Sequence, residues 1–129
     1  MTRTDDTFVK LEDRAYMSNQ LEGDASISIH ANTYTDPAIS GTETYYYNNE
    51  SLPFAHEIHK QLLKATGFKD RGVKDEGWMV LKKSNSLAIL MEVGYLTNLS
   101  NETDMLSEQH QDRVAQGIVQ GIKTYFAQN

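Results

Sequence analysis

The sequence contains no cysteine, few basic residues and no long apolar run. Without cysteine there is neither a disulfide nor a thiolate metal site, so His, Asp or Glu must hold any bound metal. The opening residues 1–6 lack the apolar core of a signal peptide, and no segment approaches the roughly 20 apolar residues that span a membrane. We therefore expect no signal peptide in this chain and no membrane association.

Acidic residues outnumber basic ones, eighteen to twelve, and give the chain a formal net charge of -6. Such a surface repels nucleic acid and anionic lipid, so we expect neither as a partner. A length of 129 residues suits one domain that buries roughly two-thirds of its unfolded surface. The sequence thus predicts a single domain over residues 1–129.

Hydrophobic periodicity predicts an α/β fold with alternating helices and strands. The pattern favours helices over 11–21, 51–67 and 108–126, and strands over 25–31, 41–47, 78–82 and 87–93. Asp6 or Thr7 is the expected cap of the first helix, and residues 69–77 read as a polar loop. The continuous apolar character of 87–93 indicates burial on both faces. We therefore expect a mostly parallel or mixed twisted sheet with helices on both faces.

The last predicted helix carries an apolar stripe and two glycines in its interior. Gly117 and Gly121 lie four residues apart, where each costs about 1 kcal/mol relative to alanine. Close packing of this helix on the sheet is the expected reason. The residues expected to point inward are Val114, Ile118, Val119, Ile122 and Phe126.

Two apolar strands each end in a residue suited to hydrolytic chemistry. Residues 25–29 lead to His30, and residues 87–91 lead to Glu92. A polar residue at a strand end lies at the rim of the sheet, where open α/β sheets bind ligands. The residues alone leave two alternatives open, a hydrogen-bonded structural histidine for His30 and an ion pair with Arg71 or Arg14 for Glu92.

The remaining histidines do not form a recognisable metal motif. His56 and His59 are three residues apart on a predicted helix, whereas the zinc helix motif places its histidines four apart. We expect both on the helix surface and His110 facing solvent.

Five motifs in order resemble the zinc-dependent N-acetylmuramoyl-L-alanine amidases that cut the bacterial cell wall. The match spans nearly the whole chain, and the segment around His30 would be weak evidence by itself. The motifs are Met1-Thr2-Arg3, Ser28-Ile29-His30-Ala31-Asn32, Gly41-Thr42-Glu43-Thr44-Tyr45-Tyr46-Tyr47, Lys69-Asp70-Arg71-Gly72-Val73-Lys74 and Met91-Glu92-Val93-Gly94-Tyr95-Leu96-Thr97-Asn98.

The resemblance implies a zinc ion held by two histidines and a glutamate, with a further glutamate in catalysis. His30 matches the second zinc histidine and Glu92 the catalytic glutamate. The implied activity is that of an autolysin-type hydrolase, outside the cell or in the wall, that cleaves the amide between N-acetylmuramic acid and L-alanine in peptidoglycan. Arg71 is a candidate for binding a peptide carboxylate or the oxyanion, and Asn32 for binding substrate or orienting a ligand. Glu43 is a candidate partner for the second ring nitrogen of a zinc-binding histidine.

In this family the first zinc histidine and the glutamate ligand precede the segment that Met1-Thr2-Arg3 matches. We therefore expect a catalytic domain that is incomplete at its amino terminus and lacks the family's first strand and helix. With His30 as its one protein ligand, zinc should bind weakly or not at all. The exposed sheet edge predicts self-association.

An alternative reading is an inactive fragment or a noncatalytic module that binds peptidoglycan stems through Arg71. The match around Glu92 argues against a third reading, a zinc peptidase that cuts within the stem peptide.

Overall fold

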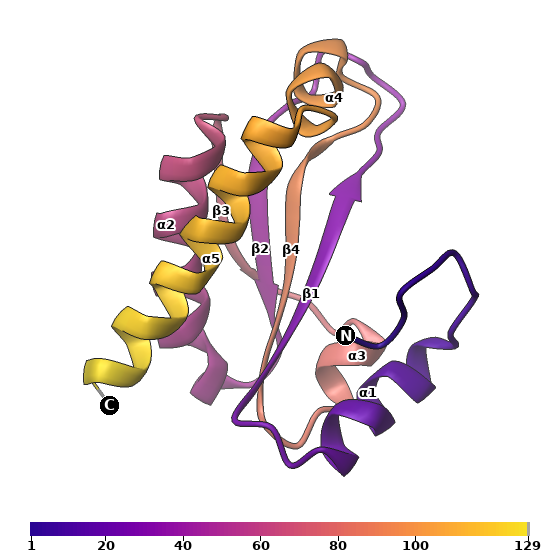
Figure 1. The fold of residues 1–129 in the computed structure, drawn as a ribbon, viewed down its shortest axis with the longest axis vertical. Helices are drawn as coiled ribbons and strands as arrows, with labels where there is room; N and C mark the ends of the chain where they lie inside the picture. Colours follow the sequence, from indigo (N-terminus) through magenta and orange to yellow (C-terminus); the bar gives the residue numbers. More distant parts are fainter. Residues whose placement is uncertain (129) are drawn as a thin grey trace.

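The computed structural model describes residues 1–128 and shows a four-stranded mixed sheet with helices on both faces (Figure 1). The sheet order is β1-β4-β2-β3. β1 pairs parallel to β4, β2 pairs antiparallel to β4, and β3 pairs parallel to β2. The predicted α/β fold with a mixed sheet is confirmed. The strands are β1 (Ala25–Asn32), β2 (Thr42–Tyr46), β3 (Asp70–Asp75) and β4 (Leu87–Tyr95).

Two long helices, α2 (Leu52–Thr66) and α5 (Glu108–Gln128), pack against each other and cover one face of the sheet (Figure 1). Both were predicted from their apolar stripes. Burial of each large apolar side chain stabilises the fold by about 1.5–3 kcal/mol. The core on this face consists of Phe54, Ala55, Ile58, Leu62, Ile89, Met91, Val93, Val114 and Ile118.

α2 begins and ends within one residue of the predicted range 51–67. Pro53 lies in its first turn, and Gly67 ends it with a φ of 67°, which glycine adopts without strain. Ser51 precedes the helix, but its Oγ accepts a hydrogen bond from the backbone N–H of Ala88 instead of capping α2. The start of α2 is thereby tied to β4.

The two glycines of α5 contact α2, so their predicted packing on the sheet is wrong. A Cβ at Gly121 would lie 3.1 Å from Cα of Ile58, and one at Gly117 would lie 3.1 Å from the carbonyl oxygen of Gln61. The glycines allow the two helices to approach closely. The helix is also rotated relative to the expectation, because Val119 is 48% exposed and Phe126 is 43% exposed.

The opposite face of the sheet carries a smaller apolar cluster and two short helices. α3 (Met79–Lys82) packs against β4, and α1 (Leu11–Gln20) packs against α3 (Figure 1). Leu81, Ala88 and Leu90 form the cluster. Lys10 occupies the cap position of α1 without a side-chain hydrogen bond, so the predicted cap at Asp6 or Thr7 is wrong.

Two predicted elements differ from the structure. Residues 70–75 form β3 rather than a loop, and residues 79–82 form α3 rather than a strand. β3 is an edge strand with no fully buried residue, so its sequence lacks apolar alternation. In the second segment only Leu81 is buried, and one helical turn is enough to bury it.

The chain connects these elements through two further short helical segments. A single 3₁₀ turn (Asn49–Ser51) precedes α2, and α4 (Leu99–Met105) follows β4. No helix among residues 1–128 is long and apolar enough to cross a membrane.

Candidate active site

One row of side chains crosses the sheet and takes one residue from each of the three strands β1, β4 and β2. His30 and Glu92 are register partners in the parallel pair β1–β4, and Glu92 and Glu43 are partners in the antiparallel pair β2–β4. Register partners point to the same face of a sheet. Thr44, the neighbour of Glu43, contacts His59 of α2, so the row faces away from α2 and α5. The predicted proximity of His30 and Glu92 is confirmed.

Glu92 is a partly buried carboxyl without a hydrogen-bond partner for its inner oxygen. Among the described residues, nothing bonds to the buried Oε2 of Glu92. Burial and the nearby charge of Glu43 raise the pKa of Glu92 to about 7. The ion pair with Arg71 or Arg14 that the sequence left open is absent from residues 1–128. Glu92 can therefore exchange a proton near neutral pH.

Glu43, directly opposite, has the contrasting environment. It is 2% exposed and accepts hydrogen bonds from Arg71 Nε at 2.5 Å, from Lys74 Nζ at 2.9 Å, and from the hydroxyls of Tyr45 and Tyr95. Burial opposes its ionisation, but these four donors outweigh burial and lower the pKa of Glu43 to about 2. Glu43 is a fixed negative charge.

The two cations that bind Glu43 also lie over aromatic rings. Cζ of Arg71 is 5.5 Å from the centre of the Tyr95 ring, and Nζ of Lys74 is 5.7 Å from the centre of the Tyr45 ring. Gly41 leaves room for this arrangement, because a Cβ there would lie 2.8 Å from Cδ of Arg71. The cations are held before any ligand arrives.

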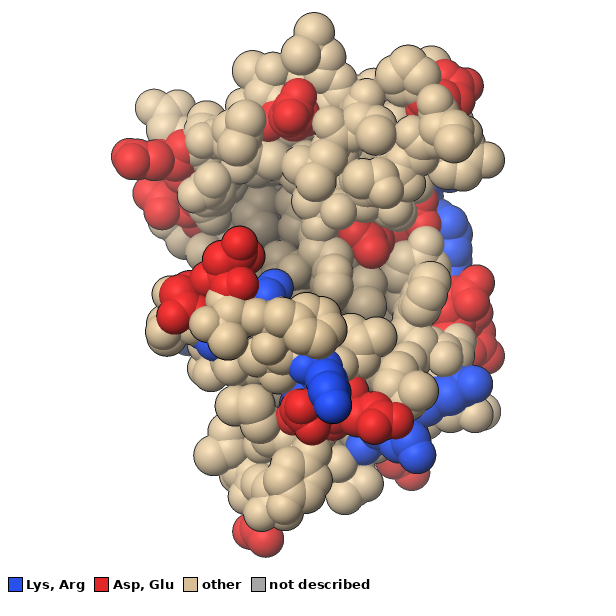
Figure 2. Space-filling model, turned by 90° about the vertical axis from the view of Figure 1, so that its right-hand side faces the viewer, with Lys and Arg blue, Asp and Glu red and all other residues tan. Residues whose placement is uncertain are grey.

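His30 lies at the β1 end of the row. Burial and the positive charges of Arg14 and Arg3 lower the pKa of His30, so its imidazole is neutral at pH 7, the form that binds metals. His30 also lines a hollow of about 470 Å³ between β1, α1 and the first three residues. Figure 2 views the molecule from the side of β1, where the surface is hollowed in its upper half over a floor of uncharged residues.

Asn32 ends β1, and its Oδ1 accepts a hydrogen bond from the backbone N–H of Thr33 at 2.8 Å. Glu43 bonds to Arg71, Lys74 and the two tyrosines, and not to His30. The geometry therefore groups Glu43 with Arg71, on the side of Glu92 away from His30.

A catalytic zinc ion takes three protein ligands and leaves one position open. Residues 1–128 contain no group of three or more His, Cys, Asp or Glu side chains close enough to hold a metal ion. His30 offers one neutral imidazole, and the nearest carboxylate on the row is Glu92. This donor set does not by itself fit a catalytic zinc ion.

Comparison with known proteins identifies the family of this chain. The family model described as N-acetylmuramoyl-L-alanine amidase matches residues 1–124. The chain belongs to this amidase family. The solved catalytic domain of CwlV, an N-acetylmuramoyl-L-alanine amidase from Bacillus (Paenibacillus) polymyxa var. colistinus, is 42% identical with a TM-score of 0.95. The match covers 98% of this chain and 70% of that domain.

Two curated relatives of this chain are longer than it. The uncharacterized protein YqiI of Bacillus subtilis is 37% identical over 98% of this chain and 63% of its own length. The probable cell wall amidase LytH of Staphylococcus aureus is 34% identical over 98% of this chain and 42% of its own length. The chain thus spans less than two thirds of either curated relative.

Two histidines of the chain are buried, against the prediction. His59 is 5% exposed and bonds through Nδ1 to Thr44 Oγ1 at 2.9 Å and through Nε2 to Asp70 at 3.0 Å. His110 is 1% exposed and stacks on Phe68 with ring centres 5.1 Å apart. His59 contacts the edge strand β3, and His110 lies near the start of α5. No local sequence pattern indicates the burial of either histidine.

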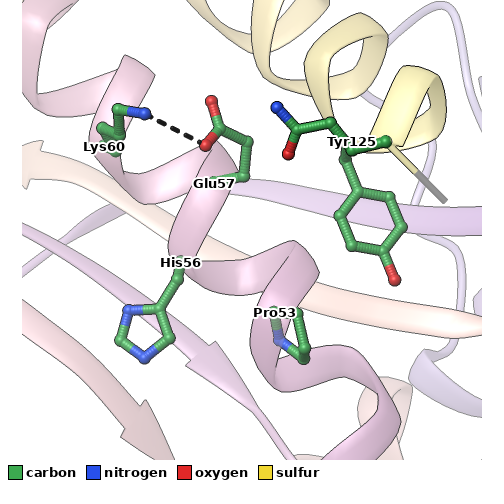
Figure 3. Close-up of a pocket in the computed structure, with 6 residues that line it drawn as sticks. Pro53, His56, Glu57, Lys60 and Tyr125 are labelled. Atoms are coloured by element: carbon green, nitrogen blue, oxygen red, sulfur yellow. Dashed lines mark hydrogen bonds and ion pairs between the residues drawn. The ribbon is translucent and has the colours of Figure 1, made fainter.

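The exposed position predicted for His56 is confirmed. His56 borders a hollow of about 580 Å³ between α2 and α5. Figure 3 shows this hollow with Glu57 and Lys60, which form an ion pair at 3.3 Å. It lies on the helical layer, on the other side of the sheet from Glu92.

Sequence reasoning missed the roles of Lys74, Tyr45 and Tyr95 around Glu43. Lys74 lies in the segment read as a loop, and the tyrosines follow ordinary strand composition. It also missed Asn101, which is 4% exposed and accepts hydrogen bonds from the backbone N–H groups of Gly41 and Tyr95. No spacing in the sequence indicates these long-range contacts.

Proposed function

We propose that this chain acts on peptidoglycan as part of an N-acetylmuramoyl-L-alanine amidase, outside the cell or in the wall. The observation that carries the proposal is Glu92, whose pKa is about 7 and whose buried oxygen has no partner among residues 1–128. A buried carboxyl left without a partner costs stability, and such groups concentrate at functional sites. Family membership supplies the bond that this carboxyl would help to cleave.

Glu92 would act as the proton-transfer group of the hydrolysis. A pKa near the working pH lets a carboxylate accept the proton of the attacking water and then give it to the leaving amine. The bond between the lactyl carbonyl carbon and the nitrogen of L-alanine breaks, and the carbonyl carbon gains the hydroxyl. Arg71 of β3 and Asn32 at the end of β1, which lie on opposite sides of β4 in the sheet, are the proposed substrate contacts.

His30 is the proposed zinc ligand of this chain. Its neutral imidazole and its register beside Glu92 support that role. Because residues 1–128 bring no group of three ligands together, tight zinc binding requires donors beyond those beside His30. Equilibrium dialysis against zinc, with His30→Ala as the variant, measures this: we expect weak binding by this chain and weaker binding still by the variant. Equal binding by both proteins would exclude His30 as a ligand.

The decisive activity test is the release of new L-alanine amino termini from purified peptidoglycan in the presence of zinc. Cleavage of the muramoyl–alanine amide would release amino termini without new reducing sugar ends, and Glu92→Gln should reduce that release by about 100-fold or more. Glu57→Gln, a glutamate of the helical layer, is the matched control and should retain activity. No release of amino termini by this chain would leave the noncatalytic alternative in place.

The free edge of β1 supports a second proposal, that the chain associates with itself. β1 is an edge strand of the described sheet, and Ile29 on it is 60% exposed. An unprotected apolar edge is a template for pairing with another strand. Sedimentation velocity should show a concentration-dependent dimer that Ile29→Lys abolishes, and a monomer at all concentrations would contradict the proposal.

A further inference from the structure

The cluster around Glu43 contains two cations, although one cation would neutralise this carboxylate. Glu43 is a single buried carboxylate, and both Arg71 and Lys74 bind it. Among the described residues, neither cation has another carboxylate within 4.0 Å. One cation and the hydroxyls of Tyr45 and Tyr95 would satisfy Glu43, so the second cation leaves the cluster with a net positive charge.

Both cations are accessible from solvent and already oriented. The side chains of Arg71 and Lys74 are 27% and 40% exposed, whereas that of Glu43 is 2% exposed. Glu43 accepts hydrogen bonds from Nε of Arg71 and Nζ of Lys74, and the rings of Tyr95 and Tyr45 lie against these two cations. A ligand that binds here has little side-chain entropy to remove, which favours affinity.

We propose that Arg71 and Lys74 together bind a carboxylate of the stem peptide, with Glu43 as the positioning residue. The identity of the ligand rests on the proposed amidase function. In a muramoyl peptide the lactyl carboxyl is consumed in the scissile amide, so the negative charges of the substrate lie on the peptide. Carboxylates form strong charge-assisted hydrogen bonds with guanidinium and ammonium groups.

This assignment also sets the direction of the substrate across the sheet. Glu92 lies in the middle of the row, with His30 on its β1 side and Glu43, Arg71 and Lys74 on its β2–β3 side. The peptide therefore extends over β2 and β3, and the glycan extends toward β1. The amine that leaves belongs to the half of the substrate that the cations hold.

The test measures binding of uncleavable peptides to this chain by calorimetry, so it does not depend on hydrolysis. The first ligand is N-acetyl-L-alanyl-D-glutamate γ-methylamide, which has one α-carboxylate, and the second is the same peptide with that carboxylate converted to an amide. A third ligand, an amidated tetrapeptide stem whose one carboxylate is at its carboxyl end, distinguishes the two sources of carboxylate within a stem.

We expect at least one of the acids to bind about tenfold more tightly than the amide, with dissociation constants in the millimolar range or below. Lys74→Gln should reduce that preference to under about threefold, and Lys74→Arg should retain it. Lys69→Gln removes an exposed charge near the start of β3 and is the matched control, with an unchanged preference. Thermal denaturation verifies that each variant is folded, which we expect because Arg71 still neutralises Glu43.

Gly41→Ala offers a variant that keeps both charges. Its Cβ would lie 2.8 Å from Cδ of Arg71 and 2.5 Å from the carbonyl oxygen of Lys69, so Arg71 must move and the preference for the acid should fall.

Equal binding of acids and amide, an unchanged preference in both Lys74→Gln and Arg71→Gln, or no binding by any of the three ligands would overturn the carboxylate site. Preference for the acid without cleavage of peptidoglycan would refute the amidase function but support the carboxylate site. Cleavage without this preference would support the amidase function but refute the carboxylate site.

Discussion

The two faces of β4 show how one strand serves both stability and chemistry. Ile89, Met91 and Val93 point toward α2 and α5 and are almost completely buried. Ala88, Leu90 and Glu92 point to the other face, where apolar cover ends at Leu90 and a carboxyl follows. The first face is closed by two long helices, and the second is left open at the site. The difference shows that the fold is stabilised on one side and exposes reactive groups on the other.

A large apolar side chain on the helical face should have the largest effect on stability. Phe54 is fully buried, and its ring lies 5.0 Å from that of Tyr125. Phe54→Ala should lower the free energy of unfolding by about 3–5 kcal/mol in urea denaturation, because it opens a cavity that the core cannot fill. Val119→Ala on the exposed side of α5 is the control, with a change within about 0.5 kcal/mol. Similar losses for both would contradict the difference in burial between Phe54 and Val119.

Removal of the buried charge on the open face should have the next largest effect. Glu43→Gln leaves Arg71 and Lys74 without their carboxylate and disturbs two tyrosine hydroxyls. We expect a loss of about 1–3 kcal/mol, below that for a fully buried pair because both cations reach solvent. Glu57→Gln, in an ion pair with Lys60 whose side chain is 58% exposed, should change stability by less than about 0.5 kcal/mol. An equally small change for Glu43→Gln would show that the cluster does not hold this face together.

The contact between the two helices of the covered face can be altered by one methyl group. Gly121→Ala places a Cβ 2.8 Å from Cδ1 and 3.1 Å from Cα of Ile58, and only the first of these atoms can rotate away. Overpacking of about 1–3 kcal/mol exceeds the gain of about 1 kcal/mol in helix propensity, so a net loss of about 1 kcal/mol is expected in thermal or urea unfolding. A stabilised variant would show that α2 and α5 separate at no cost.

The contribution of Glu92 to the free energy of unfolding should depend on pH more than on packing. Its pKa is raised from 4.5 to about 7 on folding, so the folded state binds the extra proton. The stability that this group contributes is complete below pH 4.5 and is lost as the pH rises through 7. His30 and His110 have lowered pKa values, so their contribution to stability changes with pH in the opposite direction. The quantity to measure is therefore the difference in the free energy of unfolding between wild type and Glu92→Gln. That difference should shift in favour of Glu92→Gln between pH 4.5 and 7, and a flat difference would contradict the raised pKa.

The sequence predicted those elements whose own residues carry the signal. α2, α5, β1 and β4 have regular apolar periodicity or apolar runs, and the helix stop at Gly67 is a local conformational requirement. β3 and α3 were misassigned because one is a polar edge strand and the other buries a single leucine. Their structure is determined by neighbours that are distant in the sequence.

The candidate site, like the fold, could be predicted from the sequence only in part. The sequence predicted His30 and Glu92 at strand ends, whereas β1 continues to Asn32 and β4 to Tyr95, and the register of β1 with β4 makes the two residues neighbours inside the sheet. The environment that distinguishes Glu43 from Glu92 was not predictable, because it depends on Arg71, Lys74 and Tyr95 arriving from other segments. The burial of His59 and His110 likewise depends on packing between elements rather than on helical spacing.

The most direct test of the contrast between the two faces is the pKa of the Glu92 carboxyl itself, followed by ¹³C NMR during a pH titration of the labelled chain. We predict a midpoint near pH 7 for Glu92 and, in the same experiment, a midpoint near pH 2 for Glu43. In Glu43→Gln the midpoint of Glu92 should fall, because the neighbouring negative charge is gone, while burial keeps it above that of an ordinary glutamate. An ordinary midpoint near pH 4.5 for Glu92 in the wild-type chain would contradict its role as the proton-transfer group.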